Sequence, residues 1–214
     1  KKTIAYILGS FPSAEPFVIN EIKGLQKVGV DIVVHPIYKR GLGGRDANTD
    51  GIKAIYSDPI ISLKIIAANF YYFFRKPVIY FDLLLRNKVF GGKKIFLKGV
   101  YYARAMEKKG IRHIHAHFAG YAADCARIVN KLTNIPFSLT AHQSDIHRRP
   151  ERLHEKLKEA KFILTCTKGN KEYLAFKYSD NIGSKIHAIY HGVDTSKFLP
   201  EKNIEKNIKI WEDI

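Results

Sequence analysis

The stretch that decides the fold runs from His113 to Asp145 and reads HIHAHFAGYAADCARIVNKLTNIPFSLTAHQSD. Two short apolar runs, residues 111–116 and 135–141, have the length and composition of buried strands. Between them, residues 121–132 place small and apolar side chains at helical spacing. A strand, a helix and a strand within about 30 residues form a βαβ unit, whose two strands lie parallel. The stretch therefore predicts an α/β fold built on a parallel sheet.

Polar side chains stand where both strands of this unit end. His117 closes the first strand, and His142 and Asp145 follow the second. The carboxyl ends of neighbouring parallel strands share one edge of the sheet, and ligands of open α/β sheets bind at that edge. We therefore expect these three side chains to face one crevice.

The rest of the chain extends the same alternation. Six or so strands alternating with helices predict a Rossmann-like, doubly wound, mainly parallel sheet with helices on both faces. The loop after the first strand lacks the G-x-G-x-x-G fingerprint, which disfavours a nicotinamide cofactor. Further strands are expected at residues 3–9, 30–36, 52–56, 162–167 and 186–190, and helices at 16–28, 59–110 with breaks at Pro77 and Gly91-Gly92, 153–157 and 170–178.

Composition limits the class of protein and of partner. The 214 residues are 46% hydrophobic, which suits one domain with an adequate core. A formal charge of +16 favours an anionic partner. Two cysteines, Cys125 and Cys166, cannot build a disulfide framework, and their settings predict small buried side chains in a protein of a reducing compartment.

Most of the positive charge lies in one aromatic-rich segment. Residues 53–112 hold thirteen Lys and Arg against three acidic residues and include the run Phe70-Tyr-Tyr-Phe-Phe74. Basic residues interleaved with aromatics can form an amphipathic surface for anionic lipid, so we expect an anionic membrane surface as a partner of residues 59–112. An aromatic core beneath solvated lysines explains the pattern equally well. No motif supports specific nucleic-acid binding, and the apolar run 60–74 is too short for a membrane span and contains Lys64.

Four short motifs occur in the order known from one enzyme family. Together they resemble the amino-terminal domain of a retaining GT-B glycosyltransferase of group 1 (family 4), most closely its exopolysaccharide and colanic-acid-type members. Pro16 departs from the family pattern, which often has Thr at that place. The motifs are FPSAEPFVINE (residues 11–21), HAHFA (115–119), PFSLTAHQSDI (136–146) and IYHGVDTSKF (189–198).

The resemblance implies a function and a domain plan. It implies an acceptor-binding half of an enzyme that moves a sugar from a nucleotide sugar to a lipid-linked or saccharide acceptor in surface polysaccharide synthesis. Residues 1–200 would form this domain, and residues 201–214 would be the family's final helix packing back on it. The nucleotide-sugar-binding domain would be absent, which would leave this chain inactive alone. The resemblance further implies a location in the cytoplasm, peripheral to the inner face of the membrane.

Two residues are expected to be catalytic. His142 would donate a hydrogen bond to a sugar hydroxyl or a phosphate, and Asp145 would accept one from an acceptor hydroxyl or orient His142. Their structural alternatives are a satisfied buried histidine and a helix N-cap. His113 and His115 are expected only to alternate along their strand. No third ligand at suitable spacing supports zinc, so we expect neither metal nor cofactor.

Further positions are expected to bind substrate. Gly9 would let a ligand approach the backbone at the first strand end, and the helix after it would face an anion there. The alternative at Gly9-Ser10 is a plain tight turn. Glu15 would contact the acceptor, and its alternative is a negative charge that stabilises the amino-terminal end of the helix. Gly192 resembles the family's interdomain hinge. The expected substrate-binding residues are Gly9, Ser10, Glu15, Phe17, His117 and Gly192.

Two other functions stay open at this point. A non-catalytic membrane- or saccharide-binding module would need only the crevice and the basic segment. A different Rossmann-like enzyme, such as a GT-B-type epimerase or a phosphate-handling hydrolase, would use the same sheet edge.

Overall fold

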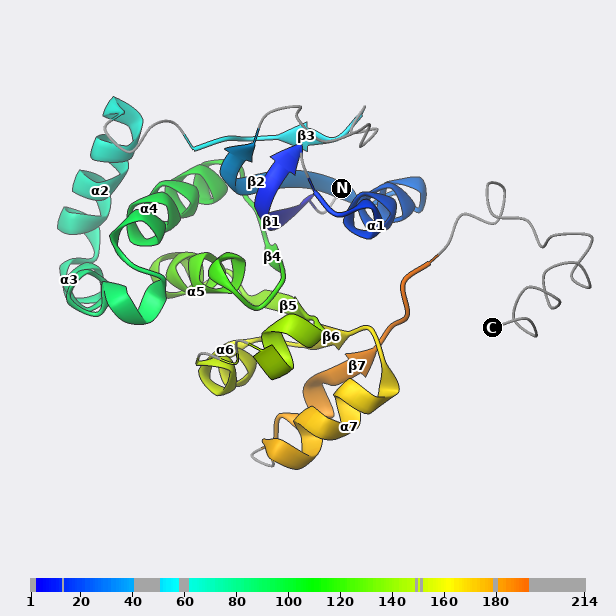
Figure 1. Ribbon diagram of the computed structural model, residues 1–214. Coiled ribbons are helices and arrows are strands. Elements are labelled where there is room, and N and C mark those ends of the chain that lie inside the picture. Colours follow the sequence, from blue (N-terminus) through cyan, green and yellow to red (C-terminus); the bar gives the residue numbers. More distant parts are fainter. Residues whose placement is uncertain are drawn as a thin grey trace, which may run out of the picture.

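A seven-stranded parallel sheet forms the centre of the computed structural model, which describes residues 3–12, 14–40, 51–57, 62–148, 150, 152–178 and 181–192. The strands lie in the order β3-β2-β1-β4-β5-β6-β7, and every neighbouring pair is parallel (Figure 1). The strands are β1 (Thr3–Pro12), β2 (Asp31–Arg40), β3 (Lys53–Ala54), β4 (His113–His117), β5 (Phe137–Ala141), β6 (Ile163–Thr165) and β7 (Ile186–Ala188).

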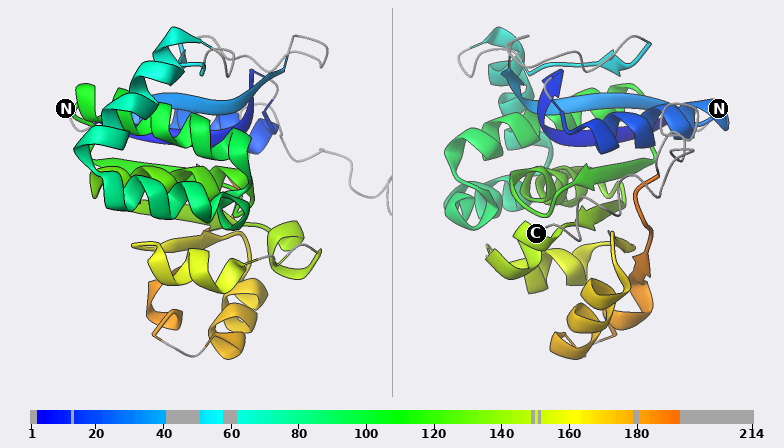
Figure 2. Two further views of the ribbon diagram at one scale, coloured as in Figure 1. Left: turned by 90° about the vertical axis from the view of Figure 1, so that its left-hand side faces the viewer. Right: turned by 45° about the vertical axis from the view of Figure 1, so that its right-hand side comes forward.

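Helices connect these strands and cover both faces of the sheet. Helix α1 lies on one face against β2, and α4 and α5 pack together on the other, with α2 and α3 outside them (Figure 2). The predicted doubly wound α/β class is therefore confirmed. The helices are α1 (Pro16–Lys27), α2 (Leu63–Arg75), α3 (Pro77–Leu85), α4 (Lys93–Lys108), α5 (Tyr121–Thr133), α6 (Leu153–Glu159) and α7 (Lys168–Lys177), with short turns η1 (Asn87–Phe90), η2 (Ser144–Arg148) and η3 (Gly183–Lys185).

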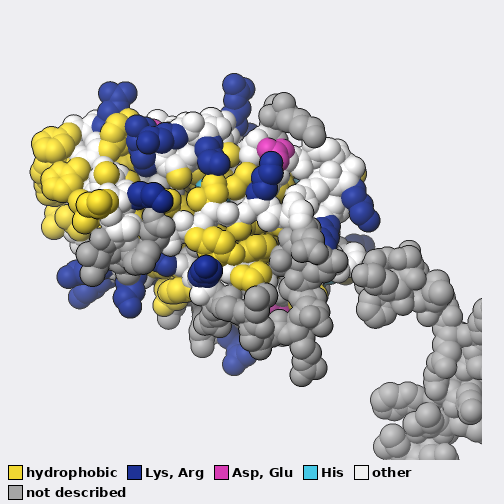
Figure 3. Space-filling model, turned by 90° about the horizontal axis from the view of Figure 1, so that it is seen from above, with side chains coloured by type: hydrophobic (Ala, Val, Ile, Leu, Met, Phe, Trp, Pro, Cys, Tyr) yellow, Lys and Arg dark blue, Asp and Glu magenta, His cyan; other side chains and the backbone are white. Residues whose placement is uncertain are grey.

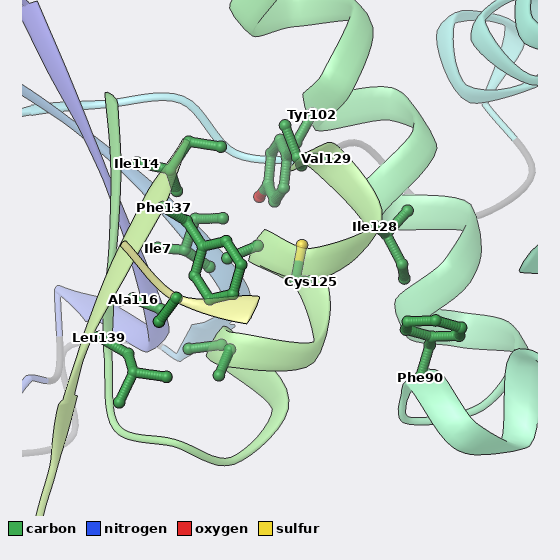
Figure 4. Packing of buried hydrophobic residues seen from close by; sticks show 14 of the residues in the cluster. Ile7, Phe90, Tyr102, Ile114, Ala116, Cys125, Ile128, Val129, Phe137 and Leu139 are labelled. Atoms are coloured by element: carbon green, nitrogen blue, oxygen red, sulfur yellow. The ribbon is translucent and has the colours of Figure 1, made fainter. Parts of the chain in front are cut away.

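The larger core lies between the sheet and the α4–α5 pair. Side chains of α5 such as Cys125 and Val129 meet Phe137 and Ile114 of the strands (Figure 4). Helix α4 comes very close to α5, because a Cβ added at Gly99 would stand 2.8 Å from a methyl carbon of Ile128. The small residues predicted on one face of the central helix therefore allow close packing of helix on sheet and of helix on helix.

Several sequence expectations need adjustment. The predicted breaks are confirmed, since α3 begins at Pro77 and η1 ends at Phe90, just before Gly91. Our expectation that both cysteines are buried was wrong for Cys166, which is partly exposed because β6 ends one residue before it. The domain end at residue 200 and the helix expected over 201–214 lie outside the described residues. None of the described helices is long and apolar enough to cross a membrane.

The order of the strands places a crevice between β1 and β4. From β1 the chain passes through α1 to β2 on one side, and the later strands β4 to β7 follow on the other. Such a reversal of strand order separates the loops that leave the two central strands, so their carboxyl ends border a crevice. The ends of β1, β4 and β5 are therefore where a ligand site is expected.

Candidate active site

Histidine and phenylalanine rings gather at the carboxyl ends of β4 and β5. The His142 ring lies 5.0 Å from the His117 ring, 4.5 Å from Phe118 and 5.3 Å from Phe17 of α1, measured between centroids. His191, after β7, stacks on His142 at 5.3 Å and lies 4.4 Å from Phe17, with the two rings tilted by 34°. The structure thus brings together three predicted site residues, Phe17, His117 and His142.

A chain of polar contacts leads from the sheet interior to His142. The Tyr6 hydroxyl donates a hydrogen bond of 2.7 Å to one oxygen of Glu21, and the other oxygen lies 3.7 Å from Nδ1 of His117. The Nε2 atoms of His117 and His142 are 3.0 Å apart. His117 is fully buried, and His142 is only 9% exposed. The orientation of His142 is therefore fixed from behind by three other side chains.

Burial keeps both imidazoles neutral at physiological pH. It lowers the pKa of His117 to about 2 and that of His142 to about 4, helped by neighbouring histidines. A 3.0 Å contact between two neutral Nε2 atoms requires one proton between them. Nδ1 of His117 has no hydrogen-bond partner among the described residues, and the nearest Glu21 oxygen, 3.7 Å away, acts on it through its charge. That charge favours the tautomer of His117 with its hydrogen on Nδ1, so we assign the shared proton to Nε2 of His142. In this tautomer, Nδ1 of His142 is a hydrogen-bond acceptor, and the expected role of His142 as a donor stays a prediction.

The other strand histidines have a structural role. Ser138 Oγ bonds both His113 Nε2 at 2.8 Å and His115 Nδ1 at 2.9 Å, and Thr140 Oγ1 bonds His115 Nε2 at 3.0 Å. His115 is buried, and its burial lowers its pKa to about 3. These contacts tie β4 to β5 and fix the register that delivers His117 beside His142.

Asp145 holds the backbone at the site. Its carboxylate accepts a 3.0 Å hydrogen bond from the backbone N–H of His142 and another from that of Ala119. Burial raises the pKa of Asp145, and these two bonds oppose that shift. These contacts reach back to residues before Asp145, whereas an N-cap side chain accepts from N–H groups two or three residues after it. A direct role of Asp145 in catalysis stays a prediction. Asp145 joins the loop after β4 to the loop after β5.

A buried ion pair anchors the same loop from α6. Lys156 Nζ donates a 2.7 Å hydrogen bond to the carbonyl of Ala119 and lies 3.3 Å from a carboxylate oxygen of Asp124. Burial lowers the pKa of Lys156 and raises that of Asp124, while their mutual attraction opposes both shifts. Phe118, just before Ala119, has a φ of 77°, which is costly for a bulky residue. Strain of this kind persists only where surrounding contacts fix the backbone.

A hollow of about 100 Å³ lies next to Phe118, which is one of its lining residues. A Cβ added at Gly9 would meet no atom within 4 Å, so there is free space next to the backbone at this position. The expected role of Gly9 in ligand binding stays a prediction. Gly192 is exposed beside His191, and its expected hinge role stays a prediction. The hollow is lined by Leu8, Gly9, Ser10, Ala14, Glu15, Val18 and Phe118, which include three expected substrate-binding residues.

Sequence reasoning missed several members of the site. Glu21 lies one helical turn after Phe17, so the (i, i+4) spacing could have placed it on the same face of α1. Phe118 could not be identified in this way, because nothing in the sequence predicts a positive φ at a phenylalanine. Spacing along the sequence indicated no third metal ligand, whereas the fold brings Cys166 and His191 to His142 from the ends of other strands.

A family comparison agrees with this geometry. The sequence profile of glycosyltransferase family 4 matches residues 14–197, most of the chain. This chain belongs to glycosyltransferase family 4. The matched range includes the histidines after β4 and β5 and four residues of the hollow, namely Ala14, Glu15, Val18 and Phe118. The family assignment that the motifs suggested is therefore confirmed. No curated protein sequence matches the chain.

Solved structures show the same fold at low sequence identity. A glycosyltransferase from Rickettsia africae aligns with 99% of this chain at 16% identity and a TM-score of 0.54. MurG from Acinetobacter baumannii aligns with 96% of this chain at 14% identity and a TM-score of 0.55. MnaA from S. aureus, solved with UDP, aligns with 98% of this chain at 12% identity and a TM-score of 0.52. The alignments cover 50%, 47% and 50% of those chains. This family 4 chain therefore has the fold of one GT-B half and spans about half the length of these proteins.

Proposed function

We propose that this chain is the acceptor-binding half of a retaining hexosyltransferase that moves a sugar from a nucleotide sugar to a lipid-linked or saccharide acceptor in surface polysaccharide synthesis. The observation that carries the proposal is the placement of His142. Its ring is fixed by His117 and Glu21 at the crevice edge, one phenylalanine away from an open hollow. Family membership supports the reaction class.

The chemical role of this half is to hold the sugar and the acceptor in position for the transfer. In the transfer, the bond from the anomeric carbon to the nucleoside diphosphate breaks and a bond to the acceptor oxygen forms. The acceptor hydroxyl passes its proton to a phosphate oxygen of the leaving group. Nδ1 of His142 would accept a hydrogen bond from a sugar hydroxyl, and Glu15 at the hollow would accept one from the acceptor. Oriented groups of this kind lower the barrier by holding the reactants in place.

Transfer assays with matched histidine variants test this role. Labelled sugar from a panel of nucleotide sugars is offered to membrane lipid extract, with this chain alone and with a nucleotide-binding GT-B half added. We expect transfer only with both halves, since this chain alone should bind donor weakly. We expect a loss of about 100-fold or more in His142→Ala and little change in His187→Ala, at an exposed position of β7. Equal activity in the two variants, or transfer by this chain alone, would refute this assignment.

We also propose that α2 and α3 dock this half on an anionic membrane at its cytoplasmic face. The aromatic-core alternative explains Tyr72 and Tyr80, which are buried, but other apolar side chains point outward. From above, hydrophobic side chains gather at the end of the molecule that carries these helices, with Lys and Arg around them (Figure 3). The exposed large apolar residues of α2 and α3 are Leu63, Ile66, Phe70, Phe74, Val78, Ile79, Phe81 and Leu85, and exposed basic residues of the same region include Lys64, Arg75, Arg86 and Lys88.

Vesicle-binding assays distinguish docking through α2 and α3 from non-specific hydrophobic adsorption. Phe74 is 74% exposed on α2, and Phe176 is 88% exposed on α7, so Phe74→Ser and Phe176→Ser form a matched pair. We expect co-sedimentation with phosphatidylserine-containing vesicles to fall in the first variant only and to weaken with salt. Binding without any transfer in the assays above would favour the alternative, a non-catalytic membrane-binding module.

A further inference from the structure

Three side chains with metal-binding atoms meet at the ends of adjacent strands. His142 follows β5, Cys166 follows β6 and His191 follows β7, and these strands are neighbours in the sheet (Figure 1). One ligand atom from each side chain lies within 4.8 Å of the others. The imidazoles of His142 and His191 are nearly parallel, with an interplanar angle of 12°.

The chemistry of this group selects the kind of ion. A thiolate with two imidazoles suits Zn²⁺ and its analogue Co²⁺, whereas Mg²⁺ and Ca²⁺ prefer oxygen ligands. In a tetrahedral zinc site, neighbouring ligand atoms lie about 3.3–3.8 Å apart. The group needs to contract by about an ångström from its 4.8 Å limit. Cys166 is partly exposed and His191 is exposed, so both have room for that rotation.

His142 already has the support that metal-binding histidines use. Such a histidine usually donates its other ring N–H to a neighbour, which fixes the tautomer and raises the basicity of the ligating nitrogen. Here Nε2 of His142 faces Nε2 of His117, and the Glu21 carboxylate lies behind Nδ1 of His117. In the tautomer assigned above, Nδ1 of His142 carries a free lone pair.

A second group of potential ligands, Glu21, His115 and His117, lies deeper in the described part of the chain. Both ring nitrogens of His115 are already occupied by hydrogen bonds to Ser138 and Thr140. A metal there would have to break the contacts that join β4 to β5. This inner group therefore serves as hydrogen-bonded support for the outer one.

We propose that His142, Cys166 and His191 form a binding site for a zinc-like divalent ion at the edge of the crevice. The ion would occupy the free nitrogen of His142 and leave one coordination position open. Because that nitrogen is the atom proposed above to contact a sugar hydroxyl, occupancy would oppose sugar binding. The binding site itself does not depend on the proposed function.

Cobalt titration of the reduced, chelator-treated protein tests the site directly. We expect one Co²⁺ per chain, tetrahedral visible bands, a sulfur-to-cobalt charge-transfer band and displacement by Zn²⁺. Cys166→Ser should abolish the charge-transfer band. His191→Ala and Glu21→Gln should each weaken Zn²⁺ binding about 10-fold or more, the latter through lost support of His142.

Matched controls come from the same chain. Cys125→Ala removes the only other cysteine, which is buried in α5, and His187→Ala removes an exposed histidine of β7. Both should bind cobalt as the wild type does. A further readout needs no variant: bound Zn²⁺ should protect the Cys166 thiol from an alkylating reagent, and mass spectrometry can map that protection. An octahedral spectrum without sulfur charge transfer, or no protection of Cys166, would overturn the proposal.

Discussion

The two walls of the crevice are built in opposite ways. The β4 wall, residues 118–120, is held by Lys156 and Asp145 and has a strained backbone. The β1 wall, made of Gly9, Ser10, Ala14 and Glu15, borders a hollow. The two walls therefore have different roles. The held wall fixes the imidazoles in place, and the open wall leaves space for a ligand.

Lys156→Met should break the held wall most severely. It leaves the buried Asp124 carboxylate without its 3.3 Å partner and frees the Ala119 carbonyl. Breaking a buried ion pair from one side costs about 3–5 kcal/mol. Urea unfolding should show that loss, whereas Lys158→Met, at an exposed position of the same helix, should stay within about 0.5 kcal/mol of the wild type. Equal losses in both variants would mean that Lys156 does not anchor this wall.

Asp145→Ala should loosen the same wall by a smaller amount. The carboxylate receives two backbone hydrogen bonds, and hydrogen bonds to charged groups contribute about 1.5–3 kcal/mol. We expect a loss of stability in that range and faster amide exchange at Ala119 and His142. Asp82→Ala, on the exposed face of α3, is the control and should change neither quantity. Unchanged exchange at both amides in Asp145→Ala would contradict this role.

Acid should weaken the strand pair behind the held wall. Burial lowers the pKa of His115 in the folded state to about 3 from 6.5, so below pH 6.5 the unfolded chain binds a proton that the folded chain does not. Stability is therefore greatest above pH 6.5 and falls toward pH 3, by about 1.4 kcal/mol per pH unit for each such proton. His115→Gln should flatten this slope in chemical unfolding, and His187→Gln should not. Identical slopes in both variants would contradict the assignment.

Gly9→Val should leave the free energy of unfolding nearly unchanged and reduce ligand binding at the open wall. A Cβ at Gly9 has free space, and so has one at Gly24 on the exposed side of α1. We expect Gly9→Val to reduce sugar transfer by the combined halves at least 10-fold, since its side chain enters the hollow. Gly24→Ala should keep full transfer and gain up to about 1 kcal/mol of stability. Full activity in Gly9→Val would show that the acceptor binds elsewhere.

The open wall was easier to predict than the held one. Strand-like apolar runs and the order of elements were enough to place Gly9, Ser10 and Glu15 together, because parallel strands end at a common edge. The approach of His117 to His142 followed from the same rule. Lys156, 36 residues after Gly120, carried no sequence signal for its loop, because buried ion pairs form through tertiary packing. Cys166 and His191 follow neighbouring strands β6 and β7, so the sheet-edge rule could also have placed them beside His142.

Phe118 lines the hollow, and the centroid of its ring lies 4.5 Å from that of His142. Protons near the face or edge of such a ring feel its ring current, and the size of that field changes steeply with tilt. A molecule that enters the hollow and tilts Phe118 should therefore shift the NMR signals of His142 without touching it. The imidazole is thus a built-in spectroscopic reporter, with which unlabelled saccharides could be screened one by one.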